Sequence, residues 1–266
     1  MAEQWEDGGL AERDWATDFS EAFTAPASAV QSRIWTEVYG DDFPVGLDTF
    51  SYLTSSELER ASDELCVPAG GLLADLACGR GGPGLWLASR CHARLVGVDI
   101  AGPGLAAARL RATSLGLDTM AEFREGSLEA TGLPTGSLDG AVSFDALLFS
   151  PDKAAAILEM ARVLKPGARL VMTTWDYHRQ PSGRPPQVAD HRPLLEQAGF
   201  SVRAYDETPR WREFLDRTDQ LMLEATEELA AETGLSSERI RAELEEARST
   251  TECMIRRVFV IAVLAG

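Results

Sequence analysis

The sequence predicts an α/β fold built on a mostly parallel, doubly wound sheet. Apolar, strand-like runs alternate with helical stretches between residues 71 and 208, which is typical of strand–helix–strand units. The first run ends in a glycine-rich turn, residues 79–84, that opens a helix. The length of 266 residues, with 45% hydrophobic and 25% charged residues, suits one large globular domain.

The elements follow one another in a regular order. Strands are expected over 72–77, 94–99, 121–125, 139–144, 168–175 and 201–206. The first of them has the apolar residues that a buried parallel strand needs, Leu72, Leu73 and Leu76. Helices are expected over 83–92, 102–115, 152–164 and 188–199, and Pro83 fits the first turn of the first of them. A final apolar run over 257–264 predicts a seventh strand, and residues 178–186 resemble a linker.

Two segments lie outside the alternating region. The predicted division separates residues 1–62 from a core of 63–266 that carries a helical insertion at 211–250, expected as one or two acidic helices. Because ligands bind at the carboxyl ends of the strands in such sheets, we hypothesise that both segments form a helical cap over that edge. The alternative is that the aromatic residues of the first segment only pack it against the sheet. These residues are Trp5, Trp15, Phe19, Phe23, Trp35, Tyr39, Phe43, Phe50 and Tyr52.

The glycine-rich turn predicts a nucleotide site. Glycines permit a tight turn and a close approach of the backbone to a ligand, and the helix N-terminus that follows favours anions. The spacing of Gly79, Gly81 and Gly84 fits a dinucleotide-binding pattern, so a nicotinamide cofactor is one alternative. Asp75 argues for another nucleotide, because a carboxylate inside a buried first strand needs a specific role.

The stretch Asp75-x-Ala77-x-Gly79-x-Gly81 resembles the acidic-x-Gly-x-Gly-x-Gly motif of class I S-adenosylmethionine (SAM) methyltransferases, with alanine at the first glycine. The resemblance covers roughly residues 66–208 and the last strand, through 94–99, 123–128, 132–134, 137–145 and 161–172. It implies a Rossmann-like methyltransferase sheet of seven strands, with the last strand antiparallel between the fifth and sixth. It also implies a Lys-Pro-Gly turn at 165–167, SAM as cofactor and S-adenosylhomocysteine as product.

The resemblance implies that one end of the cofactor lies against the glycine loop. Asp75 would lie near the cofactor ammonium group, directly or through water. Residues Ala77, Cys78, Gly79 and Gly81 would surround the methionine portion, with Cys78 as a small packed residue and not a nucleophile. Arg80 could pair with the cofactor carboxylate, and a surface salt bridge is the alternative.

The nucleoside end is expected at the next strands. Asp99 would accept hydrogen bonds from both ribose hydroxyls, and Ile100 would pack on adenine. Ser127 and Leu128 would lie at the adenine, where serine replaces the aspartate usual in the family and is a weaker acceptor. Phe144, after the fourth strand, is expected beside the cofactor.

Charge restricts the partners. A formal charge of −17 and the lack of a basic cluster disfavour nucleic acids and anionic membranes, so a small molecule is the expected methyl acceptor; the charge can also serve solubility alone.

No apolar run approaches the roughly 20 residues that span a bilayer. The N-terminus lacks a signal pattern, and the four cysteines lack metal-ligand spacing. We therefore expect a soluble, cytoplasmic protein without a metal, as a monomer or homodimer. The scarcity of lysine suggests a GC-rich bacterial genome.

Acceptor-binding and catalytic candidates follow the fourth and fifth strands. His178 is the candidate base, because imidazole titrates near working pH, although it could be a solvated loop residue. His191 and His92 are weaker candidates. Asp145 could bind an acceptor hydroxyl or amine, or hold the next loop. The aromatic candidates for contact with the acceptor, each of which could equally be core, are Phe149, Trp175, Tyr177, Trp211, Trp35 and Tyr39.

These observations predict a SAM-dependent methyltransferase that acts on a small organic molecule. The chain is most similar to ubiquinone/menaquinone and sarcosine-type enzymes, especially those of bacterial specialised metabolism. O-methylation is the first expectation, and C- or N-methylation stays open. The alternatives are a SAM-binding enzyme that catalyses cyclisation or decarboxylation, a SAM-binding regulatory subunit, and a nicotinamide enzyme.

Overall fold

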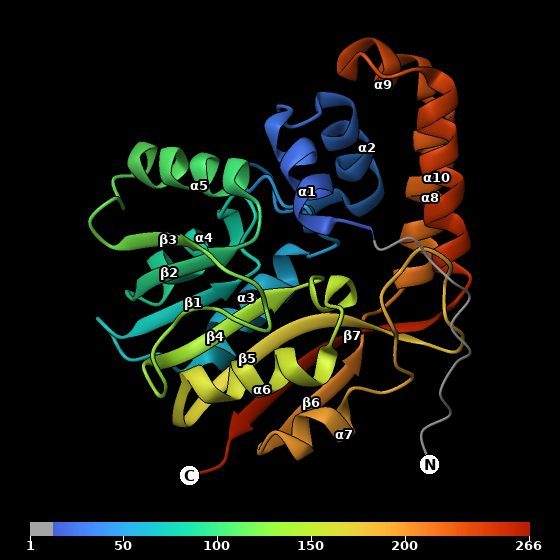
Figure 1. Ribbon diagram of the computed structural model, residues 1–266. Helices are drawn as coiled ribbons and strands as arrows, with labels where there is room; N and C mark the ends of the chain where they lie inside the picture. The colour runs from blue at the N-terminus through green and yellow to red at the C-terminus, as the bar shows by residue number, and fades with distance from the viewer. Residues whose placement is uncertain (1–12) are drawn as a thin grey trace.

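A seven-stranded sheet forms the centre of the protein in this computed structural model, which describes residues 13–266 (Figure 1). The strands lie in the order β3-β2-β1-β4-β5-β7-β6. β7 pairs antiparallel with both β5 and β6, and the other pairs are parallel, which confirms the predicted topology. The strands are β1 (Leu72–Leu76), β2 (Arg94–Asp99), β3 (Ala121–Glu125), β4 (Leu138–Phe144), β5 (Leu164–Tyr177), β6 (Phe200–Glu207) and β7 (Met254–Leu264).

Helices cover both faces of the sheet (Figure 1). One face packs against α3 (Ser55–Leu65), α4 (Gly82–Arg90) and α5 (Gly102–Ser114), and the other against α6 (Lys153–Val163) and α7 (Arg192–Gln197). Side chains alternate along each strand. In β1, Leu73 joins the core under α3–α5, whereas Ala74 and Leu76 join the core under α6 and α7. This double burial explains the continuous apolar runs in the sequence.

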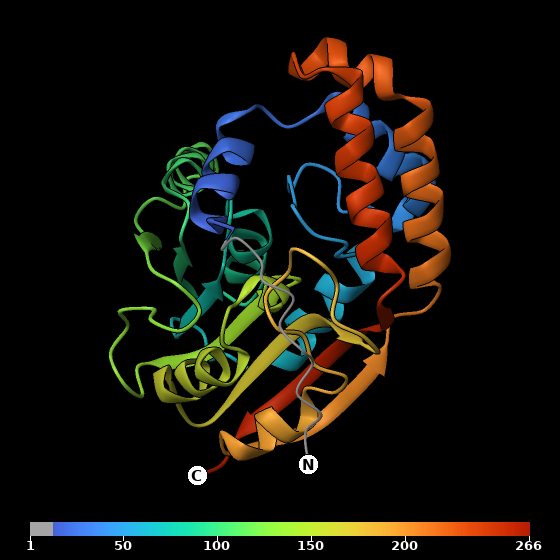
Figure 2. The ribbon, with the colours of Figure 1, turned by 45° about the vertical axis from the view of Figure 1, so that its right-hand side comes forward.

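A further group of helices lies beyond the carboxyl ends of the strands (Figures 1 and 2). It consists of α1 (Trp15–Thr24), α2 (Ala29–Tyr39), α8 (Trp211–Glu224), α9 (Thr226–Thr233) and α10 (Ser237–Thr251). Ile34 of α2 packs with Met222, Leu229 and Ile240, so the N-terminal segment and the insertion share one apolar cluster. The insertion contains three helices where one or two were predicted, because the chain turns at Ala225 and again at Gly234, whose φ is +73°.

Two predicted elements differ from the structure. The helix expected over 188–199 is the short α7, because the Val188 carbonyl accepts a hydrogen bond from the Tyr177 N–H and extends the chain there. The Lys-Pro-Gly turn at 165–167 is an irregularity inside β5, since Leu164 already pairs with Leu138 before the register shifts. Trp5 lies outside the described residues. No helix within residues 13–266 has the length and apolar character to cross a membrane.

Candidate active site

The loop after β1 is tied to β2 by its backbone. The N–H groups of Ala77 and Cys78 both donate to the Val98 carbonyl, at 2.7 and 3.0 Å. Gly79 and Gly81 have φ values of +50° and +75°, a region that side chains rarely adopt, and a Cβ on Gly81 would lie 2.9 Å from the Cβ of Ala108. Ala77 also has a positive φ, +66°, so the loop keeps the shape of the glycine motif despite this alanine. Burial raises the pKa of the Cys78 thiol, so this residue is a neutral packed side chain.

A cavity of about 410 Å³ opens at this loop, which is a volume that suits a small ligand. It lies where the carboxyl ends of β1, β2 and β4 meet the helices beyond the sheet. Most of the residues predicted at the cofactor line it: Asp75, Ala77, Cys78, Gly79, Arg80, Asp99, Ile100, Ser127, Leu128 and Phe144. Asp145 and Phe149 line it as well, whereas Gly81 lies behind the loop.

Asp75 is a buried carboxylate at the base of the cavity, with 3% of its surface exposed. Burial raises its pKa to about 7, and the negative charge of Asp99 adds to this effect. No cation among residues 13–266 forms an ion pair with it. A buried carboxylate is unfavourable without a positive partner. The site therefore fits a ligand that brings an ammonium group to this point.

Asp99 ends β2 on the same cavity. Its Oδ2 accepts the Gly79 N–H at 2.7 Å, and its Oδ1 accepts the Ala101 N–H at 2.9 Å. These bonds fix both the carboxylate and the glycine loop. Each oxygen keeps a further lone pair. A pair of vicinal hydroxyls can therefore bind there, as expected for ribose.

Arg80 is held by protein groups. Its guanidinium donates to Asp48 Oδ1 at 3.0 Å and to the carbonyls of Ala22 and Ala25 at 3.2 and 2.5 Å. These bonds hold the end of α1 over the glycine loop. The Phe23 ring lies so close to the loop that a Cβ added to Gly79 would be 3.2 Å from it. The structure thus supports the salt-bridge alternative for Arg80, and a role for it at the cofactor carboxylate stays a prediction.

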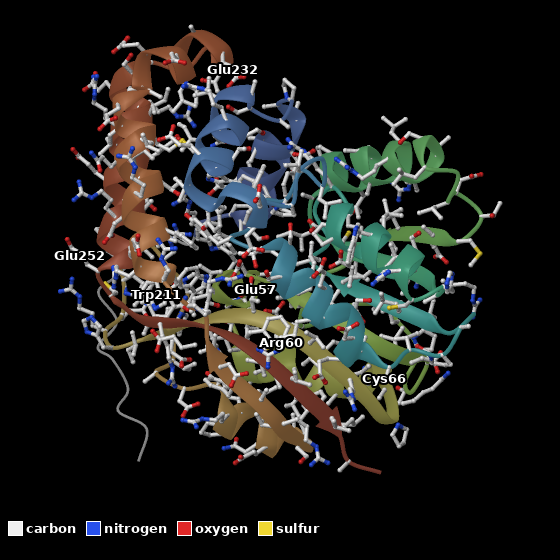
Figure 3. The ribbon with its side chains drawn as sticks, turned by 180° about the vertical axis from the view of Figure 1, so that it is seen from behind. Glu57, Arg60, Cys66, Trp211, Glu232 and Glu252 are labelled. Atoms are coloured by element: carbon white, nitrogen blue, oxygen red, sulfur yellow. The ribbon has the colours of Figure 1, made fainter. Side chains whose placement is uncertain are left out.

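Asp145 belongs to a buried polar cluster that shapes the cavity. Arg257 of β7 donates to Asp145 through Nε and Nη2, both at 2.9 Å, and to Glu57 through Nη1 at 2.6 Å. The Tyr52 N–H also donates to Asp145, at 3.0 Å. Figure 3 shows Glu57 where α3 approaches β7. Asp145 therefore has a structural role, but it holds the segment before α3 against the sheet, and not the next loop that the second prediction named.

His178 and most of the aromatic candidates do not line the cavity. His178 is exposed, and its Nε2 lies 2.9 Å from the Glu252 carbonyl oxygen. Trp175, Tyr177 and Trp211 form a buried cluster under α8. Trp35 and Tyr39 pack between α2 and its neighbours, with the Tyr39 ring 4.7 Å from that of Phe214. His191 is buried, and its Nδ1 lies 3.0 Å from Asp176 Oδ1, away from the cavity lining.

Residues that sequence reasoning left out of the site complete the cavity. Trp15, Phe19 and Phe23 of α1 line it, although only a general cap had been expected from them. Their spacing of four places three rings on one helix face, and this signal could have identified them. Phe50 lines it too, and it likewise had been named only among the aromatic residues of the first segment. Nothing local marked the others, which include the loop residues Asp48, Thr49, Ser51, Glu129 and Ser150.

Lys153 has a strongly perturbed pKa. Its Nζ donates to the carbonyl of Ser150, which lines the cavity, at 3.2 Å. Lys153 is 5% exposed, and burial lowers its pKa from 10.5 to about 7. Burying the charged form of Lys153 lowers the free energy of unfolding. Above pH 10.5 the lysine is neutral in both the folded and the unfolded state, so this cost is absent. The cost grows as the pH falls towards 7 and is constant below pH 7.

We expect Lys153→Met to raise the free energy of unfolding at pH 7 by about 1–3 kcal/mol, with the gain shrinking towards pH 10. Urea unfolding at pH 7, 8.5 and 10 measures this. Lys165→Met, which removes only the half-exposed pair with Asp139, should change the free energy by less than about 1 kcal/mol. A gain that does not depend on pH would contradict the prediction.

Comparisons with known proteins agree with this geometry. A sequence profile described as a methyltransferase domain matches residues 74–172. The methyltransferase GfsG of Streptomyces halstedii is 30% identical over 129 residues, which are 48% of this chain and 46% of GfsG. The 27-O-demethylrifamycin SV methyltransferase of Amycolatopsis mediterranei is 24% identical over 220 residues, which are 74% of this chain and 81% of that protein. The chain spans less than half the length of the first curated relatives that it matches.

A solved structure shares the fold across almost its whole length. The cyclase SpnF superposes with a TM-score of 0.68 at 20% sequence identity, over 91% of this chain and 98% of SpnF. The match at residues 74–172 covers β1 to β5 and hence the glycine loop, Asp75 and Asp99. Residues 74–172 are therefore identified as a methyltransferase domain, which supports the expected resemblance to class I SAM-dependent methyltransferases for this part of the chain.

Proposed function

We propose that this protein transfers a methyl group from SAM to a small organic acceptor. The observation that carries the proposal is the meeting of three features in one cavity: the glycine loop, the unpaired carboxylate of Asp75 and the carboxylate of Asp99. Together they offer a site for an ammonium group and for a pair of hydroxyls, which are groups that SAM has at its two ends.

In this proposal the protein acts mainly by alignment. Bound SAM would supply a methyl group on a positively charged sulfur. Asp75 would bind the ammonium group and Asp99 the ribose, while Ile100, Ser127 and Leu128 would enclose the adenine. Holding two reactants in line is worth roughly 7–11 kcal/mol of the barrier. The aromatic residues of α1 would keep water from the reaction. His178 lies outside the cavity lining, so the proposal does not use it as a base.

We propose an acceptor oxygen as the first choice for the methyl group. The 27-O-demethylrifamycin SV methyltransferase, whose name specifies an oxygen, covers most of this chain. GfsG and that enzyme come from Streptomyces and Amycolatopsis, and these sources support a role in bacterial specialised metabolism. Carbon and nitrogen stay alternatives, because other relatives are named as C- and N-methyltransferases.

Titration calorimetry with S-adenosylhomocysteine on ligand-stripped protein tests the cofactor assignment. We expect one site per chain, and the absence of binding heat would refute the proposal. Detection of S-adenosylhomocysteine as a product, with acceptor and SAM present, then tests transfer itself.

Asp75→Asn is expected to weaken S-adenosylhomocysteine binding while stabilising the fold. The amide cannot attract an ammonium group as a carboxylate does, so we expect a loss of affinity of roughly tenfold or more. Folding ionised Asp75 is costly because its pKa rises from 3.8 to about 7. This cost is absent below pH 4, grows up to pH 7 and is constant above. The gain in melting temperature over the wild type should therefore increase from pH 4 to 7. A stabilised variant with unchanged affinity would remove Asp75 from the cofactor site.

One observation favours a second function, a reaction on this fold without methyl transfer. The structure of the cyclase SpnF covers 91% of this chain. The two functions differ in the cofactor balance: methyl transfer forms one S-adenosylhomocysteine per product molecule, whereas cyclisation leaves SAM unchanged. Chromatography of a completed reaction distinguishes them.

A further inference from the structure

One side of the cavity is a continuous wall of aromatic rings. Trp15, Phe19 and Phe23 come from α1, Phe50 from the segment before α3, and Phe149 from the end of the short helix after β4. Ring centroids are 4.8 Å apart in both Trp15–Phe149 and Phe19–Phe149, and 5.5 Å apart in Phe23–Phe50. We call these five residues the aromatic wall. None of these five residues is among those proposed to hold the ammonium group, the ribose or the adenine, so the aromatic wall is available to a second ligand.

Within residues 13–266, no cation that lines the cavity is free to pair with an anionic acceptor. Arg80 is the one cation among the described lining residues, and it is already bonded to Asp48 and to two carbonyls of α1. The other charged lining residues are carboxylates: Asp48, Asp75, Asp99, Glu129 and Asp145. A phosphate or carboxylate would lose its hydration without gaining a positive partner, and this is unfavourable.

The wall is equally unsuited to a cationic acceptor, because protein cations already lie over its rings. The Arg184 guanidinium lies 5.0 Å from the Trp15 centroid and 5.3 Å from that of Phe149. Arg13 lies 4.6 Å from Trp15, and Arg80 lies 5.4 Å from Phe23. Aromatic rings bind an ammonium through their negative faces. A second positive charge at the same rings would be repelled.

Arg184 differs from the other two arginines in its ion pairing. Arg13 is paired with Asp18 and Glu246, and Arg80 with Asp48. Arg184 has no ion pair within residues 13–266, and its buried Nε finds no hydrogen-bond partner there. The charge of Glu246 acts on Arg184 without forming an ion pair, so among the described residues the positive charge at the rings is only partly offset.

We propose that the acceptor is an uncharged, predominantly apolar molecule that packs against the aromatic wall. This inference rests on the proposed function, since it concerns the acceptor side of the same cavity. The wall selects by charge: the carboxylates of the cavity reject anions, and the guanidinium groups over the rings reject cations.

Three probes with one ring system test this selection. 2-Naphthalenemethanol is neutral, 2-naphthoate is anionic and 2-naphthylmethylammonium is cationic at pH 7. Calorimetry is performed on protein saturated with S-adenosylhomocysteine. We expect the neutral probe to bind at least about tenfold more tightly than either charged probe, since one unpaired charge in such a site costs more than 1.4 kcal/mol. A charged probe that binds as tightly as the alcohol would overturn the inference.

Variants then locate the selection in the wall. Phe149→Ala should weaken the neutral probe by roughly three- to tenfold through the loss of stacking, with unchanged S-adenosylhomocysteine affinity. Phe214→Ala removes a half-buried ring outside the cavity and should change neither affinity. Arg184→Met should strengthen the cationic probe by roughly threefold or more and leave the neutral probe within about twofold. An Arg184→Met protein that rejects the ammonium as strongly as the wild type would refute the role of this charge.

The saturating step separates this inference from the proposed function. If S-adenosylhomocysteine does not bind, the proposed function fails before any probe is added. If it binds but the neutral probe is not preferred, only the inference about the acceptor is wrong.

Discussion

Replacing Arg257 with methionine is expected to lower the free energy of unfolding by about 3–5 kcal/mol. The guanidinium is 1% exposed, and it bonds to Asp145, to Glu57 and to Thr208 Oγ1. Its removal leaves the buried carboxylate of Asp145 and the partly buried one of Glu57 without their cation. Breaking a buried pair from one side costs far more than the pair contributes net, because the remaining charge is no longer compensated.

Urea unfolding followed by circular dichroism measures this loss. Arg203→Met on the neighbouring strand β6 is the matched control, because Arg203 is exposed and forms no ion pair within residues 13–266; its effect should stay within about 0.5 kcal/mol. Adding Asp145→Asn and Glu57→Gln to Arg257→Met should restore part of the stability, since the unpaired charges are then gone. A loss below about 1 kcal/mol for Arg257→Met alone would show that the cluster is not a major source of stability.

The consequence for function follows from Tyr52. Asp145 accepts the Tyr52 N–H, and the neighbouring residues 48–51 line the cavity. Loss of Arg257 should therefore loosen the part of the cavity that carries Phe50. Arg257 positions this wall without touching it.

Asp99→Ala is expected to weaken S-adenosylhomocysteine binding by roughly 1.5–3 kcal/mol, or about 10–150-fold. The variant loses the proposed acceptor of the ribose hydroxyls. It also frees the N–H groups of Gly79 and Ala101, which Asp99 now fixes at 2.7 and 2.9 Å. Both effects act at the cofactor site, so affinity should fall further than stability.

Calorimetry measures this change directly. Asp99→Asn retains one acceptor oxygen and should fall between the wild type and Asp99→Ala. Asp118→Ala removes an exposed carboxylate beyond the far end of α5 and should leave the affinity unchanged. If Asp99→Ala binds S-adenosylhomocysteine as the wild type does, the ribose assignment is wrong.

Local patterns were sufficient to predict which carboxylates meet at the glycine loop, where we propose the cofactor. Asp75 lies four residues before Gly79 on a strand, and Asp99 ends the next strand. The carboxyl ends of neighbouring parallel strands meet at one edge, so chain order alone brings these carboxylates to one cavity. The same rule placed Phe144 and Asp145 there.

The side of the cavity that we propose for the acceptor could not be predicted from local patterns. Asp145 and Arg257 are 112 residues apart, and Arg80 reaches Ala22 over 58 residues. Nothing local distinguishes an aspartate that binds a ligand from one held by a distant arginine. His178 shows the same limit: its position after β5 pointed towards the cavity, but the strand continues to Tyr177 and carries the imidazole to the Glu252 carbonyl.

The sequence by itself determined the sheet, its chain order and the glycine-rich loop at the cavity, because hydrophobic periodicity and glycine spacing are properties of consecutive residues. Only the tertiary structure decided which charges stay free and which rings face the ligand. Pairing and burial depend on elements that are remote in the chain: α1 over the glycine loop, β7 against Asp145, and Arg184 over the rings of Trp15 and Phe149.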